Sequence, residues 1–392
     1  MIRTKIGYKH TIHFETVTPV AVLNGDSLSP LSDYTVDPQN PYEALLLNHK
    51  MFEERLLNKP EMMGLYIKNS VNTKGNKTNH FLYDFLKNYY SRSEVLEFFN
   101  KKCSISGNGN TVELRTCIKD AARPYIPGST LKGAFKSMWL YNWLTENPKI
   151  VDKIINRINN AYGNKWLQRE INKIIEECLD SNLKSGERMD FSTLQITDAY
   201  TDGELQWYHC NRFHIKASKN NEKAIPSFIE AISKDSIGKF LISIENNKVV
   251  SSNKKEICSL KTDSLKTFFE MINKYAIANI EHEIVMTSNE KLSKYNIFLK
   301  RLKNEIVTSH GRSAWLPVGF GKSNFYQSIG LLIYQKDKKV FEKYIQLFKM
   351  GKKVKKNSKE FFQKEFPLTR NLTISELLPL GWIKLDEEVS KI

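Results

Sequence analysis

Glycine, hydroxyl and basic side chains are concentrated between Arg123 and Lys136, in the segment Arg-Pro-Tyr-Ile-Pro-Gly-Ser-Thr-Leu-Lys-Gly-Ala-Phe-Lys. Apolar residues recur at helical spacing from Leu131 onward. Ser129 or Thr130 is the expected N-cap, because a side-chain oxygen there accepts a hydrogen bond from a free backbone N–H group. The segment therefore predicts a loop that leads directly into the first turn of a helix.

A helix start of this kind suits an anion, because its unpaired N–H groups carry partial positive charge. Gly128 would let a ligand backbone approach closely. Lys132 and Lys136 are four residues apart and share one helix face, so with Arg123 they suit successive phosphates. The alternative interpretation is an ordinary capped helix with solvated lysines.

A second glycine-containing segment, Gly319-Phe320-Gly321-Lys322, precedes Ser323. It is not a Walker A loop, because Leu316 stands where that motif requires its first glycine. A dinucleotide fingerprint is also excluded. What remains is a basic turn that could press its backbone and its Phe320 ring against a nucleic acid; a tight structural turn is the alternative.

Candidates for catalysis are few. Asp33 and Asp37 occupy a polar loop and would support metal-assisted RNA cleavage only if a substrate phosphate reached them. His209 and His214 are five apart on a strand pattern, which places them on opposite faces. No metal-protease, paired-cysteine or nucleophile-elbow motif is present. We therefore predict neither a catalytic residue nor a metal or other cofactor.

The charge balance points to a polyanionic partner, with 59 Lys and Arg against 43 Asp and Glu, a formal net charge of +16. A lysine-rich solvated surface is the alternative. The five cysteines are odd in number and widely spaced, which fits a reducing cytosol. No stretch approaches the roughly 20 apolar residues that span a bilayer. The expected location is cytoplasmic.

Strand and helix patterns are intermixed without strict alternation, which predicts an α+β fold. Strand-like alternation is expected at residues 8–17, 111–119, 194–197, 205–215, 240–244 and 329–334, and helical patterns at 41–102, 150–179, 265–306 and 341–350. Three parts follow from this pattern. They are a core (residues 1–40 plus 103–250), a helical insertion (residues 41–102) and a helical C-terminal part with the glycine turn (residues 251–392).

Three segments together resemble the repeat-associated mysterious protein (RAMP) superfamily of type III CRISPR proteins. They are Thr18-Pro19-Val20, the stretch from Tyr125 to Ala134, and Gly319 to Lys322. Within it, the chain is most similar to the fifth-subunit family of the type III-A Csm effector complex. Pro379-Leu380-Gly381-Trp382 and Leu194-Gln195-Ile196-Thr197-Asp198 add to that resemblance.

The resemblance implies a ferredoxin-like (RRM-like) RNA-binding core with helical insertions, over residues 1–40 plus 103–250, and a second, smaller α+β part, the helical and ferredoxin-like C-terminal residues 251–392. It also implies a non-catalytic subunit that caps the 3′ end of crRNA, beside the repeated backbone subunit and the small helical subunit, and that supports crRNA maturation through host nucleases. In related backbone subunits a loop aspartate cuts target RNA. The residues around Asp33 and Asp37 do not match that loop.

From the residues and the resemblance together we predict one RNA site, formed by Arg123, Gly128, Ser129, Lys132, Lys136, Gly319, Phe320, Gly321 and Lys322. Backbone contacts of this kind position RNA without reading its sequence. A metal-dependent endoribonuclease and a repeated backbone subunit are the alternative functions.

Overall fold

The computed structural model describes residues 6–72, 80–107, 112–121, 123–163, 166–180, 194–215, 225–245, 265–351, 353–356, 359–362 and 366–387. Helices and two large sheets are combined, so the predicted α+β class is confirmed. The helices are α1 (His49–Leu57), α2 (Pro60–Asn72), α3 (Phe81–Leu86), α4 (Arg92–Glu97), α5 (Gly128–Glu146), α6 (Pro148–Asn159), α7 (Leu167–Asp180), α9 (Lys266–Met286), α10 (Ser293–Thr308), α11 (Gly330–Lys336) and α12 (Lys338–Leu347).

The first sheet has the strand order β14-β18-β1-β13-β10-β8-β7, with β9 paired to β13. Its strands are β1 (Ile6–Thr16), β7 (Lys119–Asp120), β8 (Arg123–Ile126), β9 (Leu194–Ile196), β10 (Ala199–Thr201), β13 (Ile237–Glu245), β14 (Ser313–Pro317) and β18 (Trp382–Glu387). β1 pairs antiparallel with both β13 and β18. Strands from both ends of the chain therefore build this sheet together.

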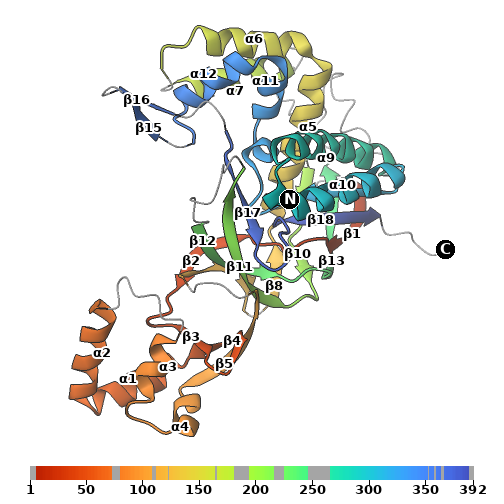
Figure 1. Ribbon diagram of the computed structural model, residues 1–392. Helices are drawn as coiled ribbons and strands as arrows, with labels where there is room; N and C mark the ends of the chain where they lie inside the picture. The colour runs from red at the N-terminus through yellow and green to blue at the C-terminus, as the bar shows by residue number, and fades with distance from the viewer. Residues whose placement is uncertain are drawn as a thin grey trace, which may run out of the picture.

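The second sheet has the order β2-β6-β12-β11-β5-β4-β3, with β17 paired to β11. Its strands are β2 (Leu23–Leu28), β3 (Tyr34–Asp37), β4 (Asn40–Leu47), β5 (Phe99–Ser106), β6 (Leu114–Cys117), β11 (Leu205–His214), β12 (Ile225–Ile232) and β17 (Thr369–Thr373). β15 (Lys353–Lys356) and β16 (Lys359–Phe362) form a separate hairpin. In Figure 1 α1–α4 lie at one end of the molecule, and α6, α7 and α12 lie at the other.

Period-2 alternation on β1 sends Ile12 and Phe14 into the core, where both are almost fully buried. Phe14 contacts Phe240 of β13, with ring centroids 6.4 Å apart. Phe240 in turn contacts Phe135 of α5 at 6.5 Å, and Phe135 contacts Phe268 of α9 at 5.2 Å. One side of the first sheet is thus covered by α5 and α9, which fixes the position of the predicted site helix.

Two local predictions were wrong. Residues 42–47 are β4 and not helix, because they pair with both β3 and β5 and this pairing outweighs the helix preference of alanine and leucine. Residues 330–336 form α11 and not a strand, since a short buried apolar run has no decisive periodicity. The helical pattern predicted at 150–179 is confirmed, and it is divided into two helices, α6 and α7.

Candidate nucleic-acid interface

A groove of about 520 Å³ beside α10 and one of about 440 Å³ beside α5 both contain basic side chains. The second, called here the signature groove, is lined by residues from three distant segments: Val22, Leu23, Ser129, Thr130, Gly133, Ala134, Ser137, Gly319, Phe320, Lys322 and Gln327. The start of α5 forms one wall and the glycine turn forms the other. The fold therefore brings two of the predicted motifs to one place.

The glycine turn is fixed by backbone contacts with the segment that follows β1. Gly319 and Gly321 have φ angles of +69° and +91°, which L side chains rarely adopt. The Phe320 N–H group donates to the Ala21 carbonyl at 2.7 Å. A Cβ atom on Gly319 would lie 2.3 Å from the same carbonyl oxygen. Both glycines are thus required by the turn itself.

The residues that follow β1 also form hydrogen bonds with the Pro-Leu-Gly-Trp segment, Pro379 to Trp382. Gly381 donates its N–H group to the Pro19 carbonyl at 2.8 Å and accepts from Val318 at 2.7 Å. The Trp382 N–H group donates to the Thr18 hydroxyl at 2.9 Å. Three segments that are far apart in the sequence therefore form one hydrogen-bonded unit behind the signature groove.

The start of α5 differs from the prediction. The helix begins at Gly128 with Pro127 as N-cap, so the expected capping by Ser129 or Thr130 was wrong. Ser129 and Thr130 instead lie in the first turn, where their side chains line the signature groove. The hydroxyl groups thus remain available as hydrogen-bond donors toward the groove.

Gly128 lies against the protein's own backbone and does not face open space. A Cβ atom there would lie 2.3 Å from the Ile196 carbonyl oxygen. Its N–H group donates to the Asp198 carboxylate at 2.7 Å, so an anion of the chain itself already lies at this helix start. The close approach expected of a ligand backbone is therefore made by residues 196–198.

The two predicted helix lysines differ in their surroundings. Lys132 is half-buried and donates from Nζ to the Leu194 carbonyl of β9 at 2.6 Å. Lys136 is exposed. Neither belongs to the residues that line the signature groove. Lys132 is thus tied to the body of the protein, whereas Lys136 projects into solvent beside the groove.

Lys322 lies in the signature groove with its side chain half-buried. Burial lowers the pKa of its ammonium group to about 8, because the charged form loses hydration. No carboxylate of the described residues forms an ion pair with it. An anion in the groove would supply the missing counter-charge.

Phe320 and Arg123 each take part in a cation–π contact. Phe320 is half-buried, and the exposed Arg115 of β6 places its guanidinium 5.6 Å from the ring centroid. Arg123 is exposed on β8 with its guanidinium 4.8 Å from the Tyr200 ring centroid. Arg115 was not among the predicted residues, although its place on the polar face of the 111–119 strand pattern was a usable signal.

Asp33 and Asp37 each take part in a turn. The Asp33 carboxylate accepts from the Ser29 N–H group at 2.7 Å and lies 3.2 Å from His49 Nε2. The Asp37 carboxylate accepts from the Gln39 N–H group at 2.9 Å, in the β3–β4 hairpin. Among the described residues, no group of three or more His, Cys, Asp or Glu side chains could hold a metal ion.

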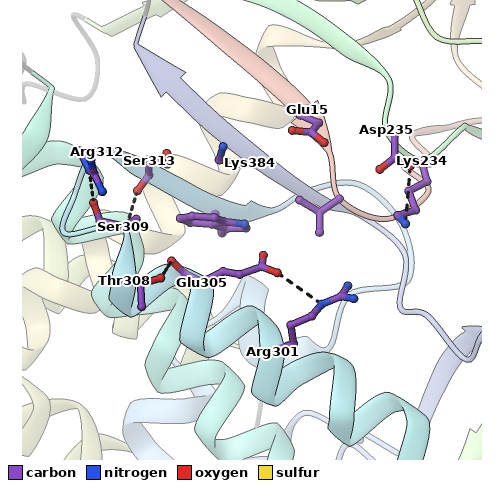
Figure 2. Close-up of a pocket in the computed structure, with 12 residues that line it drawn as sticks. Glu15, Lys234, Asp235, Arg301, Glu305, Thr308, Ser309, Arg312, Ser313 and Lys384 are labelled. Atoms are coloured by element: carbon purple, nitrogen blue, oxygen red, sulfur yellow. Dashed lines mark hydrogen bonds and ion pairs between the residues drawn. The ribbon is translucent and has the colours of Figure 1, made fainter.

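The other groove, called here the mixed-charge hollow, lies between α10 and strands β1, β14 and β18 (Figure 2). Three of its four basic residues, Lys234, Arg301 and Lys384, form ion pairs, and the fourth, Arg312, donates to the Ser309 carbonyl. Arg301 lies 3.5 Å from Glu305, and Lys234 lies 3.7 Å from Asp235. This internal compensation makes the hollow a weaker candidate for a polyanion than the signature groove.

No helix in the part of the chain that the structure describes is both long and apolar enough to cross a membrane.

Known proteins match the chain over nearly its whole length. "CRISPR system Cms protein Csm5" of Methanocaldococcus jannaschii is 22% identical over 97% of this chain and 89% of its own length. A chain of a cryo-EM structure of a Csm-crRNA-target RNA ternary complex of a type III-A CRISPR-Cas system has a TM-score of 0.65 and 19% identity, and covers 97% of this chain and 100% of its own.

Crystalline T. onnurineus Csm5 has a TM-score of 0.54 and 16% identity, with 95% of this chain and 99% of the other chain covered. Both solved structures have the same fold as this chain. The sequence model of the RAMP superfamily matches residues 13–326, which include the end of β1, the start of α5 and the glycine turn. The chain therefore belongs to the RAMP superfamily.

Proposed function

We propose that this chain is a non-catalytic crRNA-binding subunit of a type III-A Csm ribonucleoprotein, and that it caps the 3′ end of the guide RNA in antiviral defence. The observation that carries the proposal is the signature groove, which is lined by the first turn of α5 and by Lys322, a partly desolvated cation without an ion-pair partner among the described residues. Similarity to Csm5 and to a chain of a Csm-crRNA-target RNA complex supports the assignment to this assembly.

Phosphate is the chemical group that fits the groove best. Ser129 and Thr130 supply hydroxyl donors on one wall, and Lys322 supplies a cation on the other. Gly133 leaves room between them, because no atom lies within 4 Å of the position that a Cβ would occupy. These groups contact backbone and not base edges, so RNA sequence preference should be low.

Lys136 and Arg115 extend the surface beyond the groove, and the Phe320 ring lines the groove itself. The exposed lysine and arginine would contact further phosphates, and the ring would stack on a base of any identity. Lys132, Gly128 and Gly321 act in this proposal by shaping the site, since their close contacts are with Leu194, Ile196 and Leu380.

A purified full chain should bind unrelated single-stranded RNAs with similar affinity, and binding should weaken as salt rises. Filter binding across a salt series with two RNAs of different sequence measures both properties. Failure of the chain to bind RNA, alone and in the reconstituted complex, would contradict the proposal.

The non-catalytic role rests on the turn contacts of Asp33 and Asp37, which engage both carboxylate oxygens of Asp33 and one of Asp37. Substituting both by Ala should leave target-RNA cleavage by the assembled complex intact. Loss of cleavage with assembly preserved would favour the metal-dependent endoribonuclease. Incubation of the purified chain with labelled crRNA precursor and divalent metal provides a direct second measurement.

Other Csm subunits are the proposed protein partners, above all the repeated backbone subunit and the small helical subunit, with host nucleases recruited during crRNA maturation. We expect one copy in each complex, because helices α1–α4 project from one end of the molecule and would disturb a uniform filament repeat (Figure 1). Native mass spectrometry of the intact complex measures the copy number, and several copies would favour a backbone role.

A further inference from the structure

The first sheet has one side that neither α5 nor α9 covers. Residues directly opposite each other in neighbouring strands share a side. The pairs His13 with Lys239, Lys239 with Tyr200, and Tyr200 with Tyr125 therefore form one row across β1, β13, β10 and β8. Ala199 and Ile126, which alternate with this row, are fully buried on the helix side. In Figure 1 β8 and β10 lie beside β13, below the helices.

Two tyrosines in this row lie against each other with their rings tilted, and this pair is called here the tyrosine stack. The ring centroids of Tyr125 and Tyr200 are 5.2 Å apart with an interplanar angle of 31°. Both side chains are half-buried. The Arg123 guanidinium lies 4.8 Å from the Tyr200 ring centroid and extends the stack by a third flat group. Three planar groups therefore already lie in contact before any ligand arrives.

Charges of both signs surround the stack. Arg123 and Lys239 are exposed cations at its two sides. The Tyr200 hydroxyl lies 3.5 Å from the Asp120 carboxylate, and Asp198 contributes a second nearby negative charge. A purely phosphate-binding surface would exclude such carboxylates. A base suits both features, because its flat face stacks on tyrosine or guanidinium and its amino groups donate to carboxylate oxygens.

We propose that Arg123, Tyr125, Tyr200 and Lys239 form a base-stacking site for single-stranded RNA, distinct from the phosphate contacts of the signature groove. The inference rests on the proposed RNA-binding function. Continuity of the chain supports it, since only residues 126–128 separate Tyr125 from Ser129 in the groove. Four residues of chain span at most about 14 Å, so the tyrosine stack lies within a few nucleotides' reach of the groove.

The test uses the full chain and an oligouridine of about 12 nucleotides that carries one 2-aminopurine, whose fluorescence falls when it stacks. Replacing both Tyr125 and Tyr200 by Leu removes the aromatic planes. We expect affinity to fall about 5- to 100-fold and the fluorescence change to disappear. The salt dependence should stay as in the unmodified protein, because no phosphate contact is lost.

Two control variants separate stacking from other effects. Tyr125→Phe with Tyr200→Phe keeps the rings and should bind as the unmodified protein does. Tyr162→Leu removes a fully exposed tyrosine between α6 and α7 and should change nothing. If the double leucine variant binds and quenches as the unmodified protein does, the stacking site is overturned while the groove assignment stands.

A measurement on the unmodified protein covers the case in which the leucine variant fails to fold. Photocrosslinking with 5-iodouridine RNA, in the full chain and in the assembled complex, should join RNA to Tyr125 or Tyr200. Crosslinks confined to other residues would overturn the proposal and would indicate that a protein subunit covers this side of the sheet. Absence of any RNA binding would instead overturn the proposed function itself.

Discussion

The signature groove and the mixed-charge hollow differ in how their cations are compensated. In the hollow, Arg301 and Lys234 lie within 3.7 Å of a carboxylate, and Lys384 lies 3.2 Å from Asp386. In the groove, Lys322 has no such partner among the described residues, and burial lowers its pKa. The number of basic residues therefore does not identify an RNA surface. An uncompensated, partly desolvated cation is the more informative feature.

The interior offers the most extreme case of a compensated cation. Arg370 of β17 and Glu283 of α9 are both buried and form two hydrogen bonds at 2.6 and 2.8 Å. Glu283→Gln would leave the arginine without a counter-charge, so we expect the free energy of unfolding to fall by about 3–5 kcal/mol. Urea unfolding measures it.

The matched control is Glu305→Gln in the exposed pair with Arg301, which should change the free energy of unfolding by less than about 1 kcal/mol. Equal effects at the two sites would show that burial does not decide the worth of a pair in this protein, and the comparison of groove and hollow would lose its basis.

The comparison predicts that Lys322→Ala lowers the slope of log affinity against log salt by about 0.7, the value for one lost contact with single-stranded RNA. Thermal stability should hold or rise, because a partly desolvated charge is removed. Lys384→Ala in the hollow should leave the slope unchanged. A reversed result for the two lysines would move the proposed site to the hollow.

Substitutions of the two lysines of α5 should have different effects, one on stability and the other on RNA binding. Lys132→Ala removes a charged hydrogen bond to the Leu194 carbonyl and should destabilise the protein by about 1 kcal/mol. Lys136→Ala should preserve stability and lower the salt slope by at most about 0.7. Thermal melts and filter binding of each variant measure the two effects. An equal fall in salt slope for both would restore the original assignment of both lysines to phosphate.

The smallest expected effect is a pH dependence of RNA binding. Phosphate favours the protonated Lys322, whose pKa is about 8 in the free protein, so affinity should decrease a few-fold between about pH 7 and pH 9. Lys322→Arg stays charged and should abolish the decrease. Binding isotherms at several pH values measure it. A decrease that persists in the arginine variant would assign the effect to another group.

Lys322 should also make the free energy of unfolding depend on pH, in the direction opposite to RNA affinity. The unfolded chain keeps the ordinary lysine pKa of 10.5 and binds more protons than the folded chain between pH 8 and that value. The contribution of Lys322 to the free energy of unfolding is therefore unfavourable below pH 8 and becomes less so as pH rises through this window.

The sequence alone determined the α+β class, strand β1 and the helical pattern that became α9 and α10, because periodicity reports which side of an element is buried. It also determined the two motifs that line the signature groove. It could not show that Asp198 occupies the start of α5 or that Lys132 bonds to Leu194, since those partners lie more than 60 residues away.

Only the tertiary structure decided which charges stay uncompensated. The sequence does not distinguish the three lysines of the predicted site. In the structure Lys132 is hydrogen-bonded to β9 and Lys136 is exposed. Lys322 is half-buried without an ion-pair partner among the described residues. The same holds for Tyr125 and Tyr200, which β8 and β10 bring into register. Desolvation and cross-strand contact depend on distance in space, and the order of residues does not specify that distance.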